Sequence, residues 1–139
     1  MIQDRESSRR FFVEVWRKYR NNEALEPIER VLTEIILQHP EYHAELESGE
    51  DVLAADYTPE GGVSNPFLHM GMHVAIHEQV STDRPAGIRD LYRTLLEKYG
   101  DAHQLEHAMM ECLGEALWEA QRNNLPPDEQ AYLECLRRL

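Results

Sequence analysis

The chain has 139 residues and a mass of 16.2 kDa, a length that suits one domain with a modest hydrophobic core. Its 14 Lys and Arg residues against 26 Asp and Glu residues give a formal net charge of −12, and so acidic a surface repels nucleic-acid phosphates. No apolar run approaches the roughly 20 residues of a membrane-spanning helix, and the first residues do not resemble a signal peptide. We therefore expect a cytoplasmic protein that binds neither nucleic acid nor membrane, and leave open a homo-oligomer and an unknown small-molecule or protein partner.

The first half of the chain predicts three helices. Apolar residues recur at helical spacing over residues 5–19, and the basic residues of this stretch are expected on its solvated face. Pro27 is placed to open a second helix that ends near Gln38, and Pro40 to open a third. Residues 56–65 are rich in Gly and Pro and predict a loop. The part from Tyr57 to Asn65 is a candidate lid over the next helix.

The second half predicts four more helices and no strand. Asn65 and Pro66 are expected as N-cap and first residue of a helix to Val80, followed by a helix over 86–99 that Gly100 ends. Asp101 is expected to cap a helix that runs to about 123, and residues 126–129 to open a last helix that reaches the C-terminus. Short connections favour antiparallel neighbours. The prediction is a compact all-α helical bundle, one domain over 1–139.

Histidines form the chemical signal of this sequence. The seven lie at positions 39, 43, 69, 73, 77, 103 and 107. Four pairs are separated by four residues, whereas random placement would give about 0.3 such pairs. Residues at this spacing lie on one face of a helix, where two imidazoles can ligate the same ion.

Helical periodicity indicates that two of these histidine rows face inward. His69 and His73 share the apolar face of the 66–80 helix, with His77 at its edge. His103 and His107 share a face of the 101–122 helix with Glu111 at the edge, and Met110, Gly114, Leu117 and Trp118 are expected on that side too. We therefore predict one or two divalent metals between these helices. The expected ligands are His69, His73, His103, His107 and Glu111, with His43 as an additional ligand.

The ligand types limit the metal but not the reaction. An all-imidazole site suits zinc, nickel or copper, and a site with Glu111 and an open position suits iron or hydrolytic zinc. Glu106 and Glu115 are candidates for a base or for carboxylates that orient the ligands. His39 is expected at a helix boundary, capping or exposed. Cys112 falls on the side of its helix away from the histidines, so thiolate ligation is not expected, and two cysteines are too few for a disulfide scaffold.

A second interpretation needs no metal. A buried histidine is commonly neutral and hydrogen-bonded to backbone or to a carboxylate. The alternative is therefore a non-enzymatic helical interaction protein, an adaptor with a buried network of histidine hydrogen bonds.

Four segments carry a resemblance to a known family. They are His39-Pro-Glu-Tyr-His43, Tyr57-Thr-Pro-Glu-Gly-Gly62, Asn65-Pro-Phe-Leu-His69 with His73, and Glu111-Cys-Leu-Gly-Glu-Ala-Leu-Trp-Glu-Ala-Gln-Arg122. Over nearly its whole length the chain resembles a bacterial family of unknown function, which implies one domain and no particular activity. More loosely, its layout is similar to hemerythrin-like and damage-inducible-hydrolase-like bundles, in which inward histidines and carboxylates hold a metal.

Overall fold

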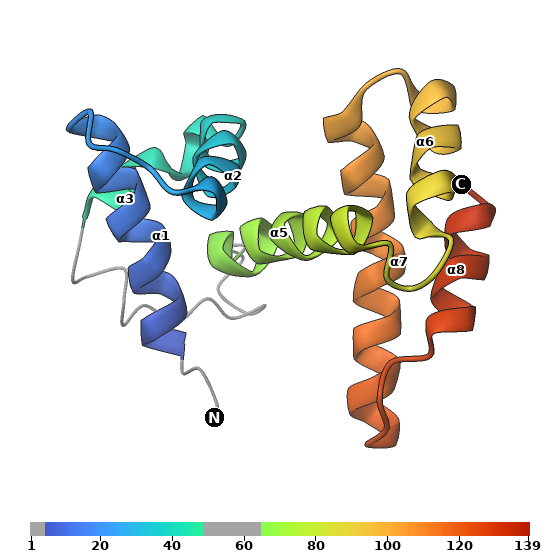
Figure 1. Ribbon diagram of the computed structural model, residues 1–139. Helices are drawn as coiled ribbons and strands as arrows, with labels where there is room; N and C mark the ends of the chain where they lie inside the picture. Colours follow the sequence, from blue (N-terminus) through green and yellow to red (C-terminus); the bar gives the residue numbers. More distant parts are fainter. Residues whose placement is uncertain (1–4, 49–64) are drawn as a thin grey trace. The chain divides into compact units, whose positions relative to one another are not determined.

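The computed structural model describes residues 5–48 and 65–139 (Figure 1). All regular structure in these two stretches is helical, so the predicted all-α fold is confirmed. By packing, the chain divides into two compact units, Met1–Val74 and Ala75–Leu139. The prediction of one domain over 1–139 stays a prediction. The expected loop at 56–64 and its lid lie outside the described residues.

The first unit contains the N-terminal helices and the beginning of α5. These elements are α1 (Arg5–Arg20), α2 (Pro27–Leu37), the 3-10 turn η1 (Pro40–Tyr42), α3 (His43–Glu47) and part of α5 (Pro66–Thr82). Helix α1 packs against α2 and α3. The starts predicted at Pro27 and Pro40 are confirmed, although Pro40 opens a single 3-10 turn before α3 continues.

Buried apolar side chains from four helices form the core of the first unit. They are Phe12, Val15, Trp16, Leu32, Ile35, Ile36, Leu46, Phe67 and Met70. The rings of Phe12 and Phe67 meet edge to face at 6.0 Å, which fastens α5 to α1. Arg9 is buried as well, with its guanidinium carbon 5.1 Å from the centroid of the Phe67 ring. The expectation that the basic residues of α1 lie on a solvated face is therefore wrong at Arg9, because a cation–π contact accommodates it.

The second unit contains the end of α5 with α6 (Ile88–Tyr99), α7 (Ala102–Asn123) and α8 (Glu129–Arg137). Helix α7 packs against both α6 and α8, which also contact each other (Figure 1). A disulfide joins Cys112 of α7 to Cys135 of α8, whose Cα atoms lie 5.8 Å apart. This bond is not predictable from the sequence, because two cysteines 23 residues apart carry no pairing signal of their own.

Helix ends follow the predicted signals closely. The Asn65 Oδ1 atom accepts hydrogen bonds from the backbone N–H groups of Phe67 and Leu68, as an N-cap should. Gly100 ends α6 with φ +74°, a conformation that costs glycine little. Asp101 precedes α7 as predicted, but its side chain makes no capping hydrogen bond.

Helix α6 begins two residues later than predicted. The Asp83 Oδ1 atom accepts hydrogen bonds from the N–H groups of Gly87 and Arg89. Gly87 has φ +98°, so the chain turns at this residue before the helix begins at Ile88.

Candidate metal centre

Three histidines meet in the first unit, and we name them the three-histidine cluster: His39, His69 and His73. The Nε2 atoms of His39 and His69 are 3.0 Å apart. Ring centroids are separated by 4.8 Å for His39 and His69, 4.9 Å for His39 and His73, and 5.0 Å for His69 and His73. The end of α2 and the first turns of α5 therefore bring together imidazoles that are 30 or more residues apart in sequence.

His39 occupies the central place in this cluster. Only 2% of the residue is exposed, and its Nδ1 atom lies 2.7 Å from the carbonyl oxygen of Ile35. A carbonyl can only accept, so Nδ1 carries a proton, and in the neutral ring Nε2 presents its lone pair. His39 lies at a helix boundary as predicted: it is the N-cap residue of η1, and its ring donates to a carbonyl near the end of α2. The alternative that it is exposed is wrong.

The other members of the cluster lie where periodicity placed them. His73 is completely buried on α5, and His69 is half-buried one turn earlier. The Tyr42 ring stacks on His39, with centroids 5.3 Å apart and planes inclined by 9°. These contacts restrict the rotamers that the His39 side chain can adopt.

His43 lies close by and has structural contacts of its own. Its Nε2 atom donates to the carbonyl oxygen of Ile36 at 2.8 Å, and its ring packs on Trp16 with centroids 4.3 Å apart. The opposite ring atom, Nδ1, is then the one that carries the lone pair in the neutral form. The role of His43 as an additional ligand stays a prediction.

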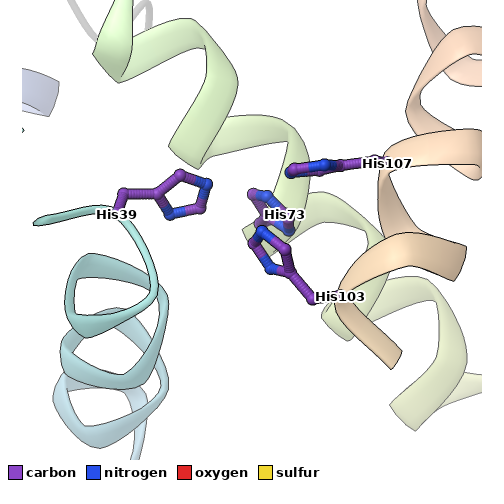
Figure 2. Close-up of side chains that lie close together, drawn as sticks. All are labelled: His39, His73, His103 and His107. Atoms are coloured by element: carbon purple, nitrogen blue, oxygen red, sulfur yellow. The ribbon is translucent and has the colours of Figure 1, made fainter. Parts of the chain in front are cut away.

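In the second unit, His103 and His107 form a pair on α7. Their rings are 4.1 Å apart, as expected for residues one turn apart on the same face (Figure 2). Figure 2 also shows His39 and His73 of the first unit. Each of these four histidines offers one imidazole nitrogen as a ligand atom.

The rest of the inward stripe predicted on α7 is only partly confirmed. Met110 is buried, but Leu117 is 41% exposed and Trp118 58% exposed, and Glu111 is exposed too. Leu105, Met109 and Cys112, which lie on the other side of α7, are buried instead. Periodicity therefore predicted the wrong side of α7 as its buried side, because α6 and α8 pack on the face that carries these three residues. Glu111 as a ligand stays a prediction.

A second polar group lies in the second unit, where α5, α6 and α7 contribute one residue each. The His77 Nε2 atom is 3.4 Å from Oε1 of the buried Glu106, and Tyr92 hydrogen-bonds the same carboxylate. Burial, and then the charge of Glu106, raise the pKa of Tyr92, so its hydroxyl keeps the proton that it donates. His77 lies at the edge of its helix face, as predicted, and Glu106 is the carboxylate beside it.

These observations define a class: an all-α protein whose helices gather imidazoles in each of two packing units. The chain belongs to the family described as "Domain of unknown function (DUF1841)", whose model matches residues 4–138. The predicted resemblance to a family of unknown function is thereby confirmed, and the looser likeness to hemerythrin-like and hydrolase-like bundles stays a prediction. No significant match was found among curated proteins or solved structures. In the described residues, no helix is long and apolar enough to cross a membrane.

Proposed function

We propose that this protein binds a divalent metal ion through the three-histidine cluster. The observation that carries the proposal is the approach of two imidazole Nε2 atoms to 3.0 Å, while the opposite nitrogen of His39 lies on a backbone carbonyl. Metal-binding histidines commonly donate their second ring N–H to a carbonyl or carboxylate in this way. Two nitrogens that ligate one tetrahedral ion at 2.0–2.1 Å would be about 3.3 Å apart, close to the observed spacing.

The α7 pair His103 and His107 is the second part of the proposal. The two residues lie one turn apart on the same face of α7, the spacing at which two imidazoles can share an ion. Glu111 and His43 are the additional ligands we propose. Nitrogen donors alone favour zinc or nickel, and a carboxylate with an open position favours iron.

The second candidate is a helical adaptor in which the same histidines hydrogen-bond one another. The chain of contacts from Ile35 through His39 to His69 favours it, because a proton on Nε2 of His69 would satisfy both rings without a metal. The stability of such an adaptor should not change when a chelator is added, whereas a metal-binding protein should become less stable.

Elemental analysis of untagged protein, purified without chelators or a nickel column, tests the proposal. We expect close to one divalent ion per chain, lost in the double variant His69→Ala/His73→Ala. His77→Ala is the matched control, since it removes a histidine from the same helix outside the cluster. Metal-free protein whose melting temperature is unchanged by each added ion would refute metal binding and favour the adaptor.

Elemental analysis also tests whether the α7 pair ligates a metal ion. In His103→Ala/His107→Ala, a fall from one ion to none means that the pair contributes to the same ion as the cluster. A fall from two ions to one means that it holds its own. An unchanged metal content would exclude these two histidines from the ligand set.

A further inference from the structure

A small cavity of about 250 Å³ lies in the second unit, within residues 76–106. Ile76, Val80 and Ser81 of α5, Tyr92 of α6, and Glu106 of α7 line it together with His77. Pockets for drug-sized ligands measure about 300–1,000 Å³, so this cavity suits a smaller molecule.

The charge on its wall is negative. Glu106 is 5% exposed, and a carboxylate so deeply buried is costly unless cations or hydrogen-bond donors surround it. Among the described residues that line the cavity, none is Lys or Arg. The Tyr92 hydroxyl on this wall keeps its proton and donates to the carboxylate.

His77 lies beside this carboxylate and is the more exposed of the two side chains. Its side chain is 42% exposed, whereas that of Glu106 is 7% exposed. An imidazole at the mouth of a cavity can turn into solvent, after which a cation from outside can take its place at the buried carboxylate. Ile76 and Val80 would then face the body of the incoming molecule.

We propose that this cavity binds a small organic amine in its ammonium form, with the ammonium group on Glu106 and the apolar part against Ile76 and Val80. This inference goes beyond metal binding and depends on a different set of residues. A buried carboxylate and a tyrosine hydroxyl give ammonium both an opposite charge and a fixed direction. The formal net charge of −12 also attracts small cations to the protein.

Benzylamine and benzyl alcohol are matched probes, because they share the ring and differ in charge. We expect benzylamine to shift the amide signals of the cavity residues in NMR titrations of the full ¹⁵N-labelled chain, with benzyl alcohol binding at least about tenfold more weakly. Glu106→Gln should weaken benzylamine at least about tenfold too, and His77→Gln should leave it unchanged or strengthen it. The control Glu119→Gln, on an exposed site of α7, should have no effect.

Two further experiments test the proposal. Val80→Phe fills the cavity and should abolish the shifts, which tests the site even if Glu106→Gln does not fold. The titration is repeated after chelation, because a neutral amine can ligate a metal directly. Equal affinity for the alcohol, indifference to both substitutions, or binding that disappears with the metal would each overturn the ammonium site, and the last would leave metal binding intact.

Discussion

The Nε2 atom of His39 faces the Nε2 atom of His69 at 3.0 Å, and the Nδ1 atom of His39 is committed to the carbonyl of Ile35. Without a metal, the proton between the two Nε2 atoms must come from His69, because neutral His39 already uses its own. With a metal, both lone pairs would point at the ion instead. The two states differ in the tautomer of His69, whose proton moves from Nε2 to Nδ1 when Nε2 binds the ion, and the number of protons on the two neutral rings stays the same.

His39→Phe removes both ring nitrogens while keeping an aromatic ring against Tyr42. Because loss of a partner that merely orients a ligand costs about 10–100-fold in metal affinity, loss of a ligand should cost more. We expect the Kd for zinc, measured by competition with a chromogenic chelator, to rise more than about 100-fold. Tyr42→Leu is the control, since it removes only the stacking partner, and it should cost less than about tenfold. Unchanged zinc affinity in His39→Phe would remove His39 from the ligand set.

The disulfide between Cys112 and Cys135 should stabilise the second unit. It closes a loop with a sequence separation of 23, for which the chain-entropy model gives about 3 kcal/mol. We expect the double variant Cys112→Ser/Cys135→Ser to lose about this much free energy of unfolding in urea, and wild-type protein with a reductant to match it. The variant itself should be insensitive to reductant. If wild type and the double variant, each with and without reductant, all unfold at the same urea concentration, the two thiols are not joined, as in a reducing cytoplasm.

The positions of the helices were predictable because their limits are local. Pro27, Pro66 and Gly100 act within a turn of where they stand, and each begins or ends a helix as expected. The apolar periodicity of α1 predicts one apolar face, on which Phe12, Val15 and Trp16 are buried, whereas Tyr19 at its C-terminal end is exposed. These signals need no knowledge of the rest of the fold.

The candidate site was predictable only in part, because the positions of some residues depend on contacts with segments far away in the sequence. His39 looked like a helix boundary, and its burial follows from α5 lying against the end of α2, with His69 30 residues away. The position of Cys135 beside Cys112 likewise requires α8 to pack on α7 in one register. Which face of α7 is buried depends on where α6 and α8 pack, and periodicity within α7 does not contain that information.

The two aspartates before α7 and α8 should differ in their contribution to stability. The Asp128 Oδ1 atom accepts from the N–H of Ala131 at 3.1 Å, whereas Asp101 makes no such bond. Loss of an N-cap costs about 1 kcal/mol, so Asp128→Ala should lower the free energy of unfolding by about that much. Asp101→Ala should lose only the interaction with the helix dipole, about 0.3–1 kcal/mol at low salt. Urea unfolding in high salt separates them: the Asp101 effect should vanish, and equal losses in both variants would contradict the assignment.

Glu29 should make the first unit sensitive to acid. Its carboxylate accepts hydrogen bonds from the backbone N–H of Glu26 at 2.9 Å and from Nζ of Lys18 at 3.0 Å. These two donors, the backbone group first, hold the pKa of Glu29 below its ordinary value of 4.5. The unfolded chain then binds the proton more readily than the folded chain.

The stability that comes from Glu29 should therefore be complete above its unfolded pKa and disappear as the pH falls through its lower folded pKa. We expect Glu29→Gln to lower the free energy of unfolding at about pH 7 and to have a smaller effect at about pH 3, as measured in urea. Lys18→Gln removes the second donor and should retain the part of the acid sensitivity that the Glu26 N–H provides. Glu34→Gln, on the exposed side of the same helix, controls for the loss of one charge. A Glu29→Gln effect of equal size at both pH values would show that the residue contributes by packing and not by its charge.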